Sequence, residues 1–405
     1  MRILLSSIYP FAFMLLFFII PFDDYIRALP NILIIILIVT FPFVIKKEHI
    51  GKLRKLPTML FIVFFGYIVL AALVTGRIET DFKIIKKIGI AAGLLVLYLP
   101  VYHDRKVQKA IMFSALAAVI FSVVSIFYAA NTNASFEFGD TQMVIEALLI
   151  DRLYLGLISV LSIVFSYYAM RREYHDHNKY YFANIVINVL FIALIVSKIA
   201  AIVCLVIFIV AQLYSKKKVL RAIMAITAIA IIFCAVFFIK NQLKSNTSKG
   251  FKTEVNTFFN TSNTWRTRIV AWDCAIKNIE NQGINLAGVG FKKTKDDLIN
   301  CYGTNIKNDT ERATFVNERY NSHNQFLDIY SSTGLIGLLL FVGFLIVTFA
   351  TNKKQFFPTA IIVTLVIYCL VENIFHRQMG AYYFGLMLII LLVSNNNPQN
   401  NTLKN

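Results

Sequence analysis

The chain has 405 residues, of which 58% are hydrophobic and only 15% are charged. A soluble domain carries about 25% charged residues, so this composition excludes an ordinary soluble protein and favours a membrane protein. The formal net charge of +18 would suggest nucleic-acid binding in a soluble chain. Here Lys and Arg gather in short turns between apolar runs, so we expect membrane lipids as partners and no nucleic acid.

Apolar runs long enough to cross a bilayer, about 20 residues each, occur along most of the chain. They predict an all-α, polytopic membrane protein of about twelve transmembrane helices. The first run, after Met1 and Arg2, has no small-x-small cleavage site and is predicted to be retained. The predicted helices are 4–21, 29–45, 57–75, 84–101, 108–129, 153–170, 181–197, 199–215, 220–239, 325–350, 356–372 and 380–394.

Two helix boundaries in this series depend on charged residues. The apolar run 181–215 is too long for one span, so we expect a tight hairpin at Ser197 and Lys198. The fourth helix is predicted to begin at 84, among Lys83, Lys86 and Lys87. Lysines are unfavourable inside a membrane unless they lie at its surface or face a wet cavity.

Basic residues occupy alternate turns, which the positive-inside rule places in the cytoplasm. Both termini are then cytoplasmic, and the long polar segment 240–324 is a large periplasmic loop. We expect residues 1–239 to hold nine helices, 240–324 the site motifs, and 325–405 three helices and a cytoplasmic tail. The basic turns contain Lys46, Lys47, Arg54, Lys55, Arg105, Lys106, Arg171, Arg172, Lys216, Lys217, Lys218, Lys353 and Lys354.

Within the long loop, residues 264–281 are predicted to form an amphipathic helix at the membrane surface. Arg268 borders its apolar face and could meet phosphate groups there. The alternative is a structural arginine stacked on tryptophan. The predicted apolar face consists of Trp265, Ile269, Trp272, Ile276 and Ile279.

Other features of this loop leave alternatives open. Cys274 and Cys301 could form a disulfide if the loop is extracytoplasmic, although their spacing does not decide this. The turn 288–290, Gly-Val-Gly, could approach a phosphate or could be an ordinary turn. Asp296 and Asp297 have no further acidic or histidine neighbours, which favours a solvated surface, so we expect neither a metal nor another cofactor.

His323 stands where the next apolar helix begins. Helix N-termini carry free backbone N–H groups and suit anions, and a histidine there can act as a general base or donate a hydrogen bond to phosphate. The alternative is that Asn321 or Ser322 caps the helix and His323 is incidental.

Charged residues near other helix ends are further candidates. Lys198 lies inside an apolar run, which is costly and suggests a function, although a lysine that snorkels at a hairpin tip would also explain it. Glu372, His376 and Arg377 cluster in the last outward turn, where they could pair with one another or orient an acceptor.

At these residues the chain resembles the O-antigen ligase and polymerase superfamily. The motifs are Arg268-x-x-x-Trp272, the Gly-Val-Gly turn 288–290, His-Asn-Gln-Phe-Leu at 323–327 and Thr-Gly-Leu-Ile-Gly at 333–337. Ser197 and Lys198 are similar to the family's Ser-Arg. The resemblance implies a GT-C-type membrane glycosyltransferase of the bacterial inner membrane, with a glycan on undecaprenyl diphosphate as donor.

The resemblance also implies roles for individual residues. Lys198, Arg268 and Asn324 would bind the donor diphosphate, and His323 and Arg268 would be catalytic, while Glu372 and Arg377 could orient the acceptor. Lysine at 198 cannot make the bidentate phosphate contact of an arginine.

Several members and relatives of the superfamily would fit this reading. In the ligases the acceptor is a lipid A–core sugar; in the polymerases it is another lipid-linked repeat unit, and a third branch glycosylates proteins. We favour a ligase that transfers with inversion and without a metal. The alternative outside the enzymes is a lipid-linked glycan transporter, although the internal repeats typical of transporters are not evident.

Overall fold

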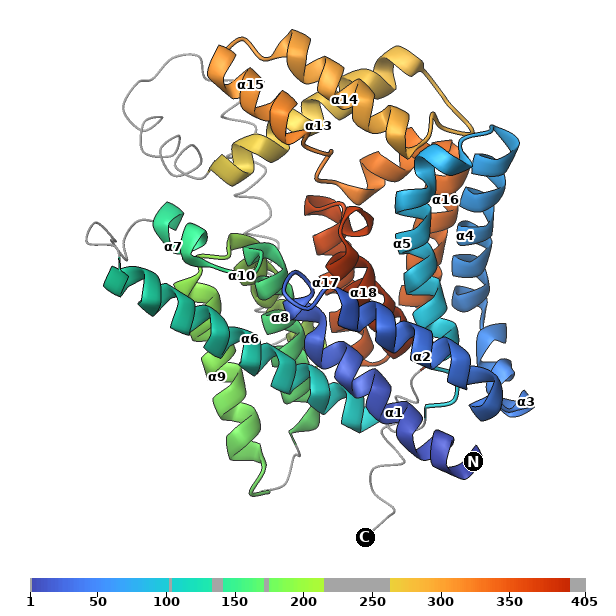
Figure 1. Cartoon of the computed structure of the whole chain (residues 1–405), viewed down its shortest axis with the longest axis vertical. Helices are drawn as coiled ribbons and strands as arrows, with labels where there is room; N and C mark the ends of the chain where they lie inside the picture. Colours follow the sequence, from blue (N-terminus) through green and yellow to red (C-terminus); the bar gives the residue numbers. More distant parts are fainter. Residues whose placement is uncertain (1, 102–103, 133–140, 171–174, 215–262, 394–405) are drawn as a thin grey trace.

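The computed structural model describes residues 2–101, 104–132, 141–170, 175–214 and 263–393. These residues form helices and turns without any strand (Figure 1), which confirms the all-α class. The predicted helix 220–239 lies outside the described residues.

Every other predicted membrane helix appears, with ends that differ by a few residues. The long apolar helices are α1 (Arg2–Ile19), α2 (Ala28–Val44), α4 (Leu56–Val74), α5 (Ile78–Leu97), α6 (Asp104–Thr132), α8 (Arg152–Ala169), α9 (Asn178–Leu194), α10 (Lys198–Leu213), α16 (Gln325–Asn352), α17 (Phe356–Val371) and α18 (Gln378–Leu388), which a π-helix (Ile389–Val393) continues. The short elements between them are η1 (Ile20–Phe22), α3 (Lys47–Ile50), η2 (Gly51–Arg54), α7 (Thr141–Ala147) and η3 (Ile374–His376).

Five of the described helices are long and apolar enough to cross a membrane, and the bent pair of α2 with α3–η2 would make a sixth. The five are α1, α4, α6, α8 and α16, whereas α9, α10, α17 and α18 are apolar but shorter. The chain therefore has the helices of a membrane protein, and the number of about twelve spans stays a prediction.

The two charged boundaries have different outcomes. The hairpin between α9 and α10 is confirmed, because α9 ends at Leu194 and α10 begins at Lys198. The predicted start of the fourth helix is wrong, since α5 begins at Ile78 and includes the lysines. One of these lysines reaches a polar group: the ammonium of Lys87, in the middle of α5, donates a hydrogen bond to the carbonyl oxygen of His376.

The centre of the bundle is formed by α8, α17 and α18, which are buried over most of their length. Around them, α4 packs on α16, α5 on α18, α8 on α9, and α1 on α2 and α6. All ten residues from Met379 to Leu388 are buried, so α18 lies among other helices rather than against lipid.

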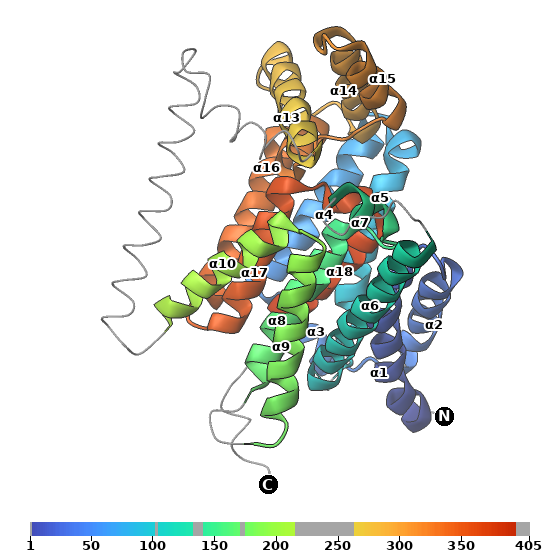
Figure 2. The same cartoon turned by 90° about the vertical axis from the view of Figure 1, so that its left-hand side faces the viewer.

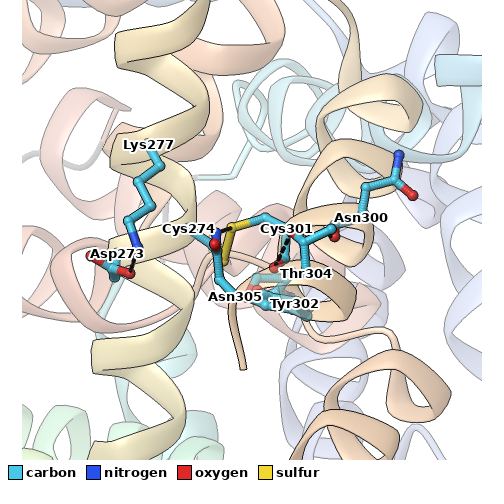
Figure 3. The surroundings of a disulfide bond; sticks show 9 residues. Asp273, Cys274, Lys277, Asn300, Cys301, Tyr302, Thr304 and Asn305 are labelled. Carbon is cyan, nitrogen blue, oxygen red and sulfur yellow. Dashed lines mark hydrogen bonds and ion pairs between the residues drawn. A yellow bond between two sulfur atoms is a disulfide. The ribbon is translucent and has the colours of Figure 1, made fainter. Parts of the chain in front are cut away.

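A small helical cap covers one end of this bundle. It consists of α13 (Asn263–Gln282), α14 (Phe291–Asn305) and α15 (Asp309–Glu318), at the end opposite the start of α1 (Figures 1 and 2). The disulfide Cys274–Cys301 joins α13 to α14 (Figure 3). The sequence left open whether these two cysteines pair, and in the structure they do. The core of the cap contains Ala271, Cys274, Ala275, Leu298, Cys301, Tyr302, Ile306 and Phe315.

Helix α13 confirms the predicted loop helix, but the predicted apolar face is not the one that packs in the cap. The buried residues include Arg268, Ala271, Cys274 and Ala275, because small side chains and a disulfide allow a close approach to α14. Ile269 and Ile276, from the predicted face, remain 57% and 46% exposed.

The glycine turn 288–290 attaches the cap to α16. The amides of Val289 and Gly290 donate to the carbonyl oxygens of Ser331 and Ser332, both at 2.9 Å. These amides are therefore occupied, and the turn is structural rather than a phosphate-binding loop. On the other side of the contact, Gly334 interrupts α16 with a left-handed φ of 76°.

We expect Gly334→Ala to destabilise the protein by about 2–5 kcal/mol, because it combines left-handed strain with overpacking. A Cβ at Gly334 would lie 2.3 Å from the backbone carbonyl of Leu286. Thermal unfolding in detergent would measure the loss. The matched control is Gly343→Ala in the same helix, where a Cβ meets open space; equal stability of the two variants would contradict the prediction.

A second prediction concerns Asp23 in the turn between α1 and α2. Burial, reinforced by Asp24 and partly opposed by Arg27, raises the pKa of Asp23 from 3.8 to about 6. The folded state therefore holds this proton more tightly than the unfolded chain does. Above pH 6 the ionised Asp23 lowers the free energy of unfolding. This loss of stability disappears as the pH falls towards 4. Asp23→Asn should therefore raise Tm at neutral pH but not near pH ~4. A pH-independent difference in Tm would contradict this.

Candidate active site

The candidate site lies where the start of α16 meets the segment that follows α17. Nδ1 of His323 is 3.1 Å from Oε2 of Glu372. Glu372 is the residue that ends α17 and is 5% exposed. His323, two residues before α16, and Glu372, at the end of a buried helix, thus form a histidine–carboxylate pair although they are far apart in sequence.

The charge state of Glu372 follows from its surroundings. Burial alone would raise its pKa, but the hydrogen bond and charge of His323, together with Arg268 and Arg377, outweigh burial and lower the pKa. The carboxylate is therefore ionised at neutral pH and only accepts hydrogen bonds.

This carboxylate fixes the tautomer of the imidazole. Nδ1 must carry the proton that it donates to Glu372, so in the neutral ring Nε2 bears the lone pair. Nε2 is buried and has no hydrogen-bond partner among the described residues. A buried basic nitrogen without a partner is suited to accept a proton from a bound substrate.

The backbone around His323 is held in an unusual conformation. His323 has a left-handed φ of 45°, and its N–H donates to Oδ1 of Asn321 at 2.9 Å. Strained residues of this kind tend to occur at functional sites, and the imidazole of this residue contacts Glu372.

The Arg-x-x-x-Trp motif of α13 joins the cap to this pair. Arg268 is 7% exposed; its Nε–H donates to the carbonyl oxygen of Val371 at 2.8 Å, and its terminal nitrogen lies 3.9 Å from Glu372. One turn later, Nε1–H of Trp272 donates to the carbonyl oxygen of His323 at 3.3 Å. The four-residue spacing places both side chains on one helical face, so the motif clamps both partners of the pair.

The start of α16 is capped by Asn324, not by Asn321 or Ser322. Its Oδ1 accepts from the amides of Phe326 and Leu327 at 3.0 and 3.1 Å. The backbone N–H of Asn324 donates to Oδ1 of the fully buried Asn373 at 2.6 Å. The side-chain oxygen of Asn324 is thus occupied, which leaves its Nδ2 for any contact with a phosphate.

The predicted cluster of Glu372, His376 and Arg377 does not pair within itself. Glu372 binds His323, whereas Nε2 of His376 lies 3.0 Å from Asp328 on α16. Arg377 forms an ion pair at 2.6 Å with Asp151, the residue that caps α8. Three separate partners therefore fix this segment against the bundle.

Lys198 reaches the site through a residue that the sequence analysis did not select. Arg152, at the start of α8, lies within electrostatic range of both Arg268 and Lys198. Gly156, one turn further along α8, packs against Ser197, since a Cβ there would lie 2.7 Å from the hydroxyl. Arg152 thus connects Lys198 electrostatically to Arg268, which lies beside the histidine–carboxylate pair, and we refer to Arg152, Lys198 and Arg268 as the row of cations.

The acidic pair of α14 is a charged surface. Asp296 forms ion pairs with Lys292 and Arg319 at 2.8 and 3.0 Å, and Asp297 pairs with Lys293 at 2.7 Å. These contacts agree with the solvated alternative.

A comparison with protein families adds to this geometry. The family model for O-antigen ligase matches residues 183–342, a segment that includes Lys198, Arg268 and His323 but neither Arg152 nor Glu372. A comparison with curated proteins gave no match. Members of the matched family are membrane glycosyltransferase-type enzymes. The resemblance predicted from the motifs is therefore confirmed: residues 183–342 of this membrane-helix protein match the O-antigen ligase domain.

Proposed function

We propose that this protein is an O-antigen ligase that transfers a glycan from undecaprenyl diphosphate to a hydroxyl of a lipid A–core acceptor. The main observation that supports the proposal is that the imidazole of His323, in the matched domain, is oriented by the buried Glu372 beside Arg268. The apolar bundle beneath a cap that contributes to the site also supports the GT-C-type class.

In the proposed reaction His323 is the general base. Nε2 accepts the proton of the acceptor hydroxyl as its oxygen bonds to the anomeric carbon of the donor. The bond from that carbon to the diphosphate breaks, and the diphosphate leaves with the electron pair. Attack opposite the leaving group inverts the anomeric carbon. Glu372 stabilises the imidazolium that forms, as a carboxylate behind a histidine does in other enzymes.

Cations stabilise the diphosphate as its negative charge grows. We assign this role to Arg268 and Lys198, together with Arg152, which interacts electrostatically with both. Asn324 then acts chiefly as the helix cap that positions His323. Fixed cations of this kind supply the charge that a metal ion provides in many glycosyltransferases, so the proposed transfer is metal-independent.

We further infer that the cap lies on the periplasmic side of the bacterial inner membrane. The disulfide Cys274–Cys301 supports this, because disulfides persist in oxidising compartments. The start of α1 lies at the opposite end of the bundle (Figure 1), in agreement with a cytoplasmic N-terminus. The proposed division is 1–239 and 325–405 for the membrane helices and tail, and 240–324 for the periplasmic loop.

The lipopolysaccharide profile of a strain that lacks the gene tests the proposal. A gel should show bare lipid A–core, while long glycan accumulates on the lipid carrier, and a plasmid copy should restore the ligated form. Core that carries one repeat unit would mean a polymerase instead. An unchanged profile would contradict both and would point to another acceptor or to transport.

A further inference from the structure

A cavity of about 370 Å³ lies beside the candidate active site. The turn between α1 and α2, the start of α8 and the residues before α18 enclose it. Its polar lining includes Asp23, Asp24, Arg27, Asn31, Asp151 and Arg377. No step of the proposed chemistry uses the first four of these residues.

The cavity shares a wall with the histidine–carboxylate pair. Arg377, which is bound to Asp151 at 2.6 Å, lies within electrostatic range of Glu372, and so does Tyr154. Tyr154 also lines the cavity, and its ring lies beneath the guanidinium of Arg377, 5.9 Å from centroid to charge. A molecule in the cavity would therefore sit next to the groups that hold His323.

The start of α8 separates this cavity from the row of cations. Asp151 caps the helix with Oδ1 and binds Arg377 with Oδ2, on the cavity side. The next residue, Arg152, is in electrostatic range of Arg268 and Lys198. Of these two neighbouring residues, Asp151 thus belongs to the acidic cavity, and Arg152 interacts with the cations Arg268 and Lys198.

The lining of the cavity is suited to sugar hydroxyls and not to phosphate. The lining contains three carboxylates and two guanidinium groups, so the cavity has a net negative charge and repels anions. Carboxylates accept hydrogen bonds, guanidinium groups donate them, and the amide of Asn31 does both. A hydroxyl needs one partner of each kind, and this mixture supplies them.

The walls of the cavity are held by contacts between distant segments. The hydroxyl of Tyr25 donates to the carbonyl oxygen of Leu149 at 2.8 Å, and Nε2 of Gln378 reaches Oδ1 of Asn31 at 3.4 Å. These bonds join the α1–α2 region to α8 and α18, so the cavity is preformed, as most ligand sites are.

We propose that this cavity binds the acceptor, through a polyhydroxylated glycan segment that carries no phosphate. This inference rests on the proposed function, because it assigns the donor and the acceptor of that reaction to two different sites near the start of α8. The donor diphosphate meets Arg152, Lys198 and Arg268, and the acceptor glycan occupies the acidic cavity, which Arg377 and Tyr154 connect to the surroundings of Glu372.

Binding of a dephosphorylated lipid A–core oligosaccharide to the full chain in nanodiscs tests this proposal. Asp24→Asn and Asn31→Ala alter exposed side chains and should preserve the fold, which thermal unfolding verifies. Asn31→Ala should weaken binding about fivefold, the effect of one lost hydrogen bond between uncharged groups, and Asp24→Asn, which removes a charged acceptor, about tenfold or more. Undecaprenyl phosphate, which probes the donor side, should bind both variants with unchanged affinity.

Asn300→Ala, on the exposed outer face of α14, is the matched control and should leave glycan binding unchanged. Wild-type affinity of both cavity variants for the oligosaccharide would overturn the proposal, as would an absence of binding to the wild-type chain. Because the assay requires no transfer, its result is independent of the gel test. Suppose that glycan binding depends on Asp24 and Asn31 but the lipopolysaccharide profile of the deletion strain is unchanged. The cavity would then be supported as a glycan-binding site, and the ligase function would be rejected.

Discussion

His323→Ala is expected to lower kcat for glycan transfer by a factor of about 100–10,000, the usual contribution of a general base. The substitution removes Nε2, the nitrogen without a partner among the described residues, which we assign as the proton acceptor. Purified enzyme with a lipid-linked donor and a lipid A–core acceptor would measure the change. The amount of the variant in the membrane should stay at the wild-type level, since the imidazole side chain packs in the site rather than in the core of the bundle.

The division between kcat and KM separates the two roles that the sequence left open for His323. Loss of a base lowers kcat and leaves the donor KM unchanged, whereas loss of a diphosphate contact raises the donor KM. His177→Ala, at an exposed position before α9, is the control and should transfer normally. Near-normal activity of His323→Ala would reject the assignment.

The helical fold was predictable because the length of an apolar run is a direct signal of a membrane helix. The helix ends were less so. The start of α5 was predicted at 84 instead of 78, because charged residues precede the apolar run, whereas the helix begins among them. Lys87 is accommodated by a hydrogen bond to a backbone carbonyl of a distant segment. The face of α13 was misassigned because large apolar residues suggested burial, whereas the small Ala271 and Ala275 make the close contact.

In the candidate site, single residues were predictable and pairs were not. Arg268, His323 and Glu372 stand out as polar groups beside apolar runs, yet only tertiary contacts show that they meet. Arg152 was missed because an arginine before an apolar run resembles an ordinary flanking charge. A signal was present: in the predicted topology Asp151 and Arg152 lie together on the outward side, where the positive-inside rule disfavours arginine.

Arg268→Ala is expected to lower kcat/KM by a factor of about 100–1,000, the effect of removing one group that stabilises charge in a transition state. The guanidinium performs two functions in the proposed mechanism. It would bind the leaving diphosphate, and it helps to keep Glu372 ionised, on which the tautomer of His323 depends. The assay is the same transfer reaction, with the concentration of the lipid-linked donor varied.

Arg268→Lys distinguishes charge from geometry at this position. Lysine keeps the positive charge but lacks the planar group that donates to Val371, so we expect activity between those of Arg268→Ala and the wild type. Arg266→Ala is a matched control on the same helix, because Arg266 is half exposed and pairs with Glu311 on the surface of the cap. Such pairs contribute about 0–1 kcal/mol, so this variant should transfer at nearly the wild-type rate. If Arg268→Ala folds and matches that control, the cation at 268 does not hold the diphosphate, and Lys198 and Arg152 would have to stabilise the leaving group without it.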